Sequence, residues 1–165
     1  MKRTALLLAC LLGGCAQRNA DSAPGTSFDP VEFFSGHSVG DAKLHLITGA
    51  THQVDVDSVG TPDERGGLVL DQAIREQGKA PRSRRWVLHP NGSNKWSGSL
   101  TDAKGPVEVE RTPVDVVIRY RMKSGPEVEQ HLKLAAEGVA DNHMSVTRFG
   151  VEVATLDERI RKLPR

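Results

Sequence analysis

Residues 114–136 read VDVVIRYRMKSGPEVEQHLKLAA, two alternating segments on either side of a short loop. The loop at 123–125 has three residues and ends in glycine, which is a common hairpin connection. On one face, it predicts Tyr120 opposite Val128, Ile118 opposite Gln130, Val116 opposite Leu132 and Val114 opposite Leu134. On the other face, it predicts Arg121 opposite Glu127, Arg119 opposite Glu129 and Asp115 opposite Lys133. Mostly apolar pairs on one face and charge pairs on the other are typical of a half-buried hairpin, because a slip of one residue would destroy both patterns.

The same alternation continues along most of the chain. A loop at 49–51 predicts a second hairpin, with Leu46 opposite Val54, Leu44 opposite Val56, Lys43 opposite Asp57 and His45 opposite Asp55. Asn91 and Gly92 predict a turn between the Trp86 and Trp96 strands, where Gly98 leaves room for an indole. Residues 68–76 and 151–160 have some helical character but are predicted as strands. The fold class is therefore all-β, an antiparallel up-and-down barrel of about 8–10 strands.

One short helix is predicted at 28–36, before the strands. Asp29 is a suitable N-cap, and Pro30 suits the first helical position because no amide hydrogen is needed there. Phe28 and Phe33 occupy the two positions of a hydrophobic staple, and Gly36 is a suitable end. This turn gathers three of the four phenylalanines of the chain. It predicts an apolar plug at one end of the barrel.

The N-terminus has the pattern of a lipoprotein signal peptide at 1–14: Lys2 and Arg3, an apolar run and a Leu-Gly-Gly-Cys box that ends at Cys15. The apolar run is too short to span a bilayer, which takes about 20 residues. Cys15 is the predicted lipid attachment site, because the rival box at Cys10 would leave almost no apolar core. Residues 15–27 then form a flexible tether and 28–165 the barrel domain. Ala16 stands where aspartate would favour the inner membrane, so the expected location is the outer membrane, facing the periplasm.

The composition of the processed chain excludes several function classes. Removal of Lys2 and Arg3 from the 22 basic residues leaves 20 against 21 acidic residues, which gives no electrostatic case for nucleic-acid binding. Cleavage removes one cysteine and lipidation uses the other, so no thiol is left for a disulfide, a metal or a nucleophile. The expected partners are a membrane, reached through the anchor, and a lipid-like small molecule; a protein partner is not identified.

The chain resembles an uncharacterised family of bacterial lipoproteins, a domain of unknown function with lipocalin-like architecture. The resemblance covers most of the barrel domain and rests on residues 28–36, Arg85 with Trp86, residues 96–98 with Asp102, and residues 148–153. Residues 107–111 and 133–140 are plainer than the family pattern, as in a divergent member. The resemblance implies a lipocalin- or calycin-like barrel that binds a small apolar molecule, and it brings no activity with it.

Motifs for catalysis or metal binding give no site. The six histidines, His37, His45, His52, His89, His131 and His143, have no tight spacing and are interpreted as surface residues. Asp55 and Asp57 are interpreted as ordinary cross-strand partners. Neither a nucleophile elbow nor a phosphate loop nor a dinucleotide fingerprint occurs. No enzyme activity, cofactor or metal is expected.

A small set of polar and aromatic residues is predicted to face the barrel interior. These candidate ligand-binding residues are Trp86, Trp96, Tyr120, Gln130 and Gln72. Apolar walls with a few polar groups are usual in ligand sites. The alternative is a packed interior whose polar groups satisfy one another, because about eight strands enclose a space that side chains can fill. Two functions therefore remain open: binding of a small apolar or lipid-like ligand, or a structural or assembly role in the envelope through a protein partner without a ligand.

Overall fold

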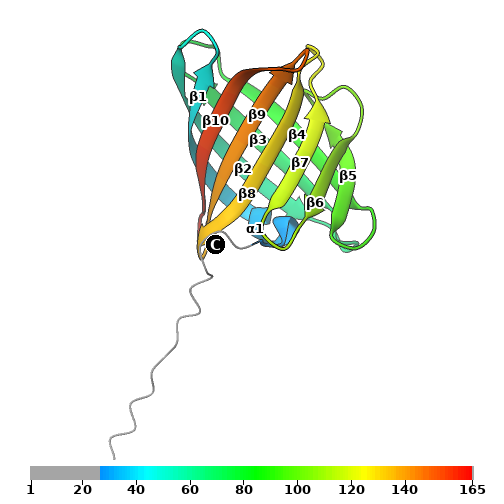
Figure 1. The fold of residues 1–165 in the computed structure, drawn as a ribbon. Helices are drawn as coiled ribbons and strands as arrows, with labels where there is room; N and C mark the ends of the chain where they lie inside the picture. Colours follow the sequence, from blue (N-terminus) through cyan, green and yellow to red (C-terminus); the bar gives the residue numbers. More distant parts are fainter. Residues whose placement is uncertain (1–26, 165) are drawn as a thin grey trace, which may run out of the picture.

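The structure, a computed structural model, describes residues 27–164, which form ten strands and one short helix (Figure 1). In chain order these are α1 (Pro30–Phe34), β1 (Gly36–Leu46), β2 (Thr51–Pro62), β3 (Leu68–Glu76), β4 (Arg82–Pro90), β5 (Lys95–Leu100), β6 (Val107–Arg111), β7 (Val116–Arg121), β8 (Glu127–Ala136), β9 (Val139–Arg148) and β10 (Val151–Lys162). Each strand pairs with the next in antiparallel fashion, and β1 also pairs with β10. The predicted closed barrel is confirmed, and both ambiguous segments are strands.

The predictions for residues 1–26, including the signal peptide, Cys15 and most of the tether, lie outside the described residues. Within 27–164, no helix has the length and apolar character needed to cross a bilayer. The same part of the chain contains no group of three or more histidine, cysteine, aspartate or glutamate residues that could hold a metal ion.

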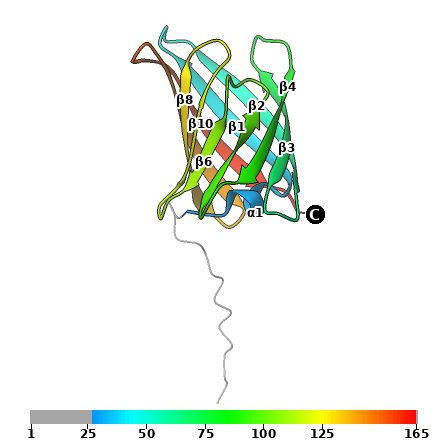
Figure 2. The ribbon, with the colours of Figure 1, turned by 90° about the vertical axis from the view of Figure 1, so that its right-hand side faces the viewer.

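Helix α1 lies across one end of the barrel, as Figure 2 shows. Asp29 Oδ1 accepts hydrogen bonds from the amides of Val31 (2.9 Å) and Glu32 (3.0 Å), which is the predicted N-cap. The ring centroids of Phe28 and Phe33 are 4.8 Å apart, as the staple requires. Phe28, Phe33 and Phe34 are all buried in the same cluster as the apolar residues of the barrel interior. The predicted plug is confirmed.

The hairpin of β7 and β8 has the predicted register, with Tyr120 opposite Val128 and Arg119 opposite Glu129. The prediction is wrong at one end, because β7 begins only at Val116. Residues 112–115 form a turn instead, in which the Thr112 amide donates to the Asp115 carbonyl at 2.9 Å. Val114 is therefore exposed rather than paired with Leu134, and the Asp115 carboxylate contacts His131 rather than Lys133.

The predicted register of β1 and β2 is wrong by four residues, because the loop lies two residues earlier than predicted. The Leu46 amide donates to the Ala50 carbonyl at 2.9 Å, so the loop is 47–49 rather than 49–51. Gly49 ends this loop with a positive φ of 86°, which suits glycine. Lys43 therefore lies opposite Gln53 and His45 opposite Thr51, while Asp55 lies opposite Asp41. The inward-facing residues are unchanged, because a shift by an even number of residues keeps each side chain on its face.

The turn between β4 and β5 is confirmed, and Trp86 and Trp96 are buried on the inner face. The role predicted for Gly98 is wrong. A β-carbon at Gly98 would lie 1.8 Å from the carbonyl oxygen of Val87, in the neighbouring strand. This glycine admits the backbone of β4 rather than an indole.

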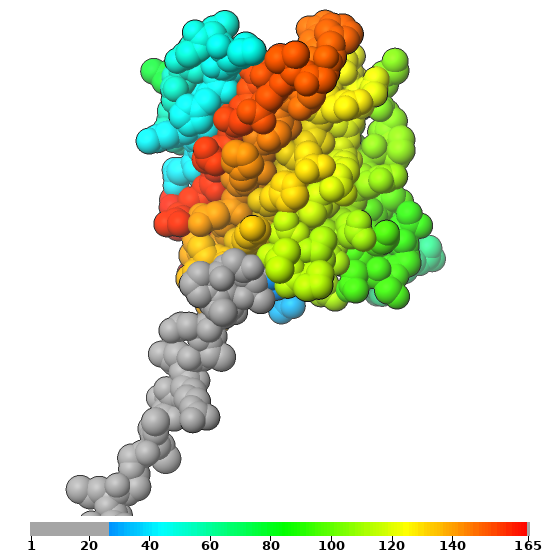
Figure 3. Space-filling view, viewed as in Figure 1, coloured from blue at the N-terminus to red at the C-terminus, as the bar shows by residue number. Residues whose placement is uncertain are grey.

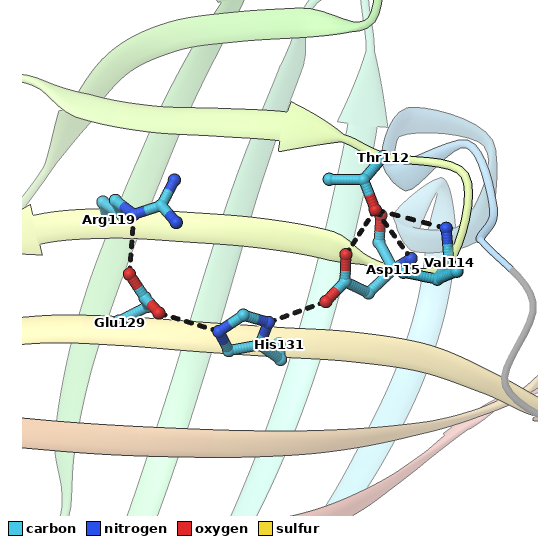
Figure 4. Close-up of polar contacts among 6 residues, drawn as sticks. All are labelled: Thr112, Val114, Asp115, Arg119, Glu129 and His131. Atoms are coloured by element: carbon cyan, nitrogen blue, oxygen red, sulfur yellow. Dashed lines mark hydrogen bonds and ion pairs between the residues drawn. The ribbon is translucent and has the colours of Figure 1, made fainter.

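On the outer wall, His131 lies between two carboxylates (Figure 4). Nδ1 of His131 is 2.7 Å from Asp115 Oδ2, and Nε2 is 2.8 Å from Glu129 Oε1. Hydrogen bonds to Asp115, and then to Glu129, raise the pKa of His131 above its ordinary value. Burial alone would raise the pKa of Asp115, but hydrogen bonds from His131 and Thr112 hold it below its ordinary value. When the imidazole is protonated, both ring nitrogens donate to carboxylates, so the ring links β8 to the 112–115 turn and has no nitrogen free to act as a base.

We expect the stability contributed by His131 to depend on pH. Since the folded pKa is raised, this contribution is complete below the unfolded value of about 6.5 and is lost as the pH rises through the folded pKa. His131→Gln should therefore lower the free energy of unfolding more near pH 6 than near about pH 9. Urea unfolding at both pH values measures this, with Lys133→Gln, an exposed change on the same strand, as the control. Equal losses for His131→Gln at both pH values would contradict the expectation.

Candidate functional site

A ladder of polar side chains crosses the inner face of β2, β3 and β4. Gln72 lies directly opposite Ser58 on one side and Arg84 on the other. Gln72 Nε2 donates to Ser58 Oγ at 2.9 Å, and Gln72 Oε1 accepts from Arg84 Nε and Trp86 Nε1, both at 2.7 Å. The Arg84 guanidinium lies 5.3 Å from the centroid of the Trp86 ring. Gln72 thereby fixes the positions of both Arg84 and Trp86.

A second set of polar side chains lies on the inner face of β8, β9 and β10. Asn142 Nδ2 donates to Gln130 Oε1 at 3.1 Å and to Glu158 Oε2 at 3.0 Å. A β-carbon at Gly40 would lie only 2.1 Å from Glu158 Oε1, so this glycine of β1 makes room for the carboxyl group. We name the two sets together the interior polar group: Ser58, Gln72, Arg84, Gln130, Asn142 and Glu158.

The charges of the interior polar group are coupled across the barrel. Burial raises the pKa of Glu158, while the hydrogen bond from Asn142 and the positive charge of Arg84 oppose that rise. Burial also raises the pKa of Tyr120, opposed by the positive charge of Arg84 and by the neighbouring Gln130 side chain. Within 27–164, the side-chain hydrogen bond of Arg84 goes to Gln72, and no ion pair joins it to Glu158. The interior therefore holds a guanidinium group and a carboxyl group that interact electrostatically without a direct hydrogen bond.

Two atoms of this group are buried without a hydrogen-bond partner within 27–164: Gln130 Nε2, a donor, and Asn142 Oδ1, an acceptor. Gln130 and Asn142 are each only 5% exposed. An unpaired buried polar group costs about 1–3 kcal/mol, so such groups often serve a ligand or water. The pair could accept a molecule that offers both an acceptor and a donor.

Apolar side chains lie above the interior polar group, towards the end of the barrel opposite α1. Leu44 and Leu156 pack directly opposite each other on β1 and β10. Met144 and Met122 are also only partly buried, at the edge of the main core cluster. Flexible methionine side chains can rearrange around an incoming apolar group.

The surface depression that reaches the interior polar group lies mainly on the outside of the barrel. A depression of about 1070 Å³ runs along β1, β8, β9 and β10 and includes Asn142 and Glu158 in its lining. Most of the other residues that line it are outward-facing and polar or charged, such as Lys43, Asp141 and Arg159. It therefore belongs largely to the outer wall, and the interior is occupied mainly by side chains.

The structure brings four of the predicted ligand-binding residues together. Gln72 contacts Trp86, and the Trp86 and Tyr120 rings meet edge to face at 5.7 Å. Gln130 projects into the same interior. Trp96 lies apart, near the plugged end, where its Nε1 donates to the Gly66 carbonyl at 3.1 Å.

Sequence reasoning missed four members of the interior polar group: Ser58, Arg84, Asn142 and Glu158. Each of them is in phase with the inward residues of its strand, as Arg84 is with Trp86. A search for polar residues in the inward phase would have found all four. It would not have shown that Arg84 and Glu158 face each other, because only barrel closure brings β4 and β10 together.

Comparison with known proteins places the chain in a family. A model of the family described as protein of unknown function (DUF3833) matches residues 9–162. The chain belongs to this family. No curated protein matches this DUF3833 member.

Solved structures with the same architecture are barrels. The S-type phycobiliprotein lyase CPES from Guillardia theta is similar with a TM-score of 0.63 and 13% identity, over 82% of this chain and 92% of that chain. A de novo designed fluorescence-activating β-barrel is similar with a TM-score of 0.47 and 8% identity, over 82% of this chain and 99% of that chain. The similarity to the lyase shows that the DUF3833 protein shares its lipocalin-like fold.

Proposed function

We propose that this protein is a lipid-anchored envelope protein that binds a small amphipathic molecule inside its barrel, without catalysing its conversion. The observation that carries the proposal is the pair of unpaired buried atoms, Gln130 Nε2 and Asn142 Oδ1, beside Glu158 and opposite Arg84. A head group placed between this pair of atoms and Arg84 would accept hydrogen bonds from Arg84 and Gln130 and donate one to Asn142. It would remove the cost of two unsatisfied groups at once.

The class of ligand follows from the surroundings of the head group. Arg84 and Gln130 favour a head group with strongly accepting oxygen atoms, and Asn142 Oδ1 requires that the same head group carry a donor, as a protonated carboxylic acid does. The raised pKa of Glu158 favours its neutral form, which reduces repulsion of such a head group. The side chains above, including Leu44, Leu156 and Met144, suit a short apolar tail. Since the interior is mostly filled, these side chains would rotate to admit it.

The barrel type also supports ligand binding. About eight strands enclose a space that side chains can just fill, and the enclosed space widens as strands are added. This barrel has ten strands in 27–164. A phycobiliprotein lyase shares the fold, which makes an interior site reasonable without naming its occupant.

The proposal predicts that Arg84 and its neighbour Arg85 respond differently to substitution. Arg84 points inward, whereas Arg85 points outward and pairs with Asp71 at 2.6 Å. Straight-chain fatty acids titrated against tryptophan fluorescence should bind the unlipidated Cys15→Ser chain, with about fourfold tighter binding per added methylene until the tail no longer fits. Arg84→Gln should weaken binding about tenfold or more, because a hydrogen bond to a charged group is lost, and Arg85→Gln should leave it unchanged.

Two results would overturn the proposal. One is that neither the fatty acids nor a matched series of uncharged alcohols shows saturable binding at any chain length. The other is an equal loss for Arg84→Gln and Arg85→Gln, since only Arg84 faces the interior. If only the alcohols bind, the interior site stands and the head-group assignment is wrong.

The proposed anchor makes a second prediction. Cys15→Ser should abolish lipid labelling and leave the chain unprocessed, because the diacylglycerol is attached to that thiol in the proposed pathway. Cys10→Ser should be labelled and processed normally. Metabolic labelling with a fatty-acid probe, followed by separation of inner and outer membranes, measures both attachment and the proposed outer-membrane location. Equal labelling of the two variants would contradict the assignment of Cys15.

A further inference from the structure

Exposed apolar side chains gather at the end of the barrel opposite α1. Ile47 in the β1–β2 loop is 65% exposed, Phe149 between β9 and β10 is 93% exposed, and Val151 is 53% exposed. The two loops are neighbours, because the Ile47 amide donates to the Val153 carbonyl at 2.9 Å. In Figure 3 these loops form the upper edge of the molecule. We name Ile47, Phe149 and Val151 the apolar tip.

Other exposed apolar residues do not join this tip. Within 27–164 the remaining large ones are Val59, on the wall of β2, and Val114, in the turn near α1. Single exposed apolar residues are ordinary, whereas three on adjoining loops call for a partner.

Basic side chains surround the apolar tip. The other three loops at this end carry Lys79, Lys104 and Lys123, all exposed, and Arg148 lies with its guanidinium 5.3 Å from the Phe149 ring centroid. The nearby carboxylates are largely paired: Asp102 with Arg82 at 2.9 Å, Glu76 with Lys79 at 2.7 Å, and Glu127 with Arg121. Because Glu76 offsets Lys79, the excess positive charge comes from Lys104, Lys123 and Arg148. Glu152 is the exposed acid beside Val151.

The loops at the α1 end have the opposite character. They carry Asp63, Glu64, Asp115 and Glu137 with one arginine, Arg65, while Lys95, Arg111 and Lys162 lie at the strand ends beside them. The loops at the two ends thus differ in charge, and the exposed apolar tip lies among the basic loops. The described chain also begins at the plugged end, at residue 27 (Figure 2).

From this arrangement we propose that the apolar tip docks on the surface of an anionic lipid bilayer. Protruding apolar side chains encircled by lysine and arginine match such a surface: the apolar groups enter the boundary between head groups and acyl chains, and the basic groups attract anionic lipids. A protein partner would be expected to meet a broad apolar patch, whereas only three apolar side chains protrude here, among basic ones. The docked end is also the one through which a ligand would reach the interior polar group, but the inference does not depend on a ligand.

The test uses tryptophan as a depth probe. The unlipidated Cys15→Ser chain carries either Phe149→Trp at the tip or, as a matched control, Val59→Trp on the wall. With vesicles of phosphatidylcholine that contain phosphatidylglycerol, the emission of Phe149→Trp should shift to shorter wavelength and be quenched by brominated acyl chains. The Val59→Trp protein should show neither effect beyond the signal of Trp86 and Trp96. Since both proteins share residues 1–26, any vesicle binding through that segment is common to the two.

The basic residues give an independent readout. Changing Lys79, Lys104 and Lys123 together to glutamine should weaken vesicle partitioning about a hundredfold, at about fivefold per lysine near an anionic surface. Binding should also fall sharply in phosphatidylcholine alone and in high salt. The same quenching in both tryptophan proteins, or partitioning that ignores the lysine changes, would overturn the proposal. Failure here would leave the fatty-acid titration of Arg84→Gln unaffected, so the two proposals are tested separately.

Discussion

Gly60→Ala should lower the free energy of unfolding by about 1–3 kcal/mol, the range for overpacking a tight interior. A β-carbon at Gly60 would lie 1.9 Å from the carbonyl oxygen of Phe34, the last residue of α1. Backbone atoms cannot move aside as a flexible side chain can, so either β2 or the plug must shift. The shift would loosen the contacts of Phe33 and Phe34 with the barrel.

Urea unfolding, followed through the buried tryptophans, measures this loss. Thr61→Ala is the matched control, because Thr61 is the exposed neighbour on the same strand and surface changes usually stay within about 0.5 kcal/mol. If Gly60→Ala is as stable as Thr61→Ala, then α1 is not seated against β2 as the structure shows.

Gln130→Leu should make the protein more stable while it weakens ligand binding. The substitution removes the unpaired Nε2 donor, whose burial costs about 1–3 kcal/mol. Asn142 Nδ2 loses one acceptor but keeps Glu158 at 3.0 Å, and Tyr120 loses its polar neighbour Gln130, so the net gain should be at most about 1 kcal/mol. Fatty-acid affinity should fall about tenfold, because the proposed head group loses a donor.

This variant separates a binding site from a packed interior. If the polar groups of a filled barrel instead satisfy one another, with Gln130 bonded to Tyr120, then Gln130→Leu should destabilise the fold and leave affinity, if any, unchanged. Gln53→Leu serves as the control, since Gln53 is an exposed amide on the outer wall of β2. It should change neither stability nor fatty-acid affinity appreciably.

Local rules predicted the elements of this protein well. The cap at Asp29, the staple of Phe28 and Phe33, and the register of Tyr120 with Val128 all depend on residues close together in the chain. The register of β1 with β2 failed for a physical reason. Both placements of the loop around Gly49 keep the same residues inward, so alternation cannot choose between them, and the hydrogen bond from Leu46 to Ala50 decides.

The candidate site was predicted only in part. Period-two alternation assigned Gln72, Trp86, Tyr120 and Gln130 to the interior, and the structure places them there. It also grouped Trp96 with them, although this indole lies near the plug and bonds to Gly66. Asp115 was assigned to Lys133, but a turn at Thr112 directs its carboxylate to His131.

The sequence by itself determined the all-β class, the inner and outer faces of the strands and the capped helix, because each depends on neighbours in the chain or on a single hairpin. The tertiary structure alone decided which inward residues meet. Pairing of β1 with β10 closes the barrel and sets Glu158 over Gly40, across the interior from Arg84. It also gathers Ile47 and Phe149 from distant loops into one tip. Alternation gives the direction of each side chain, whereas closure and register determine which side chains lie within contact distance.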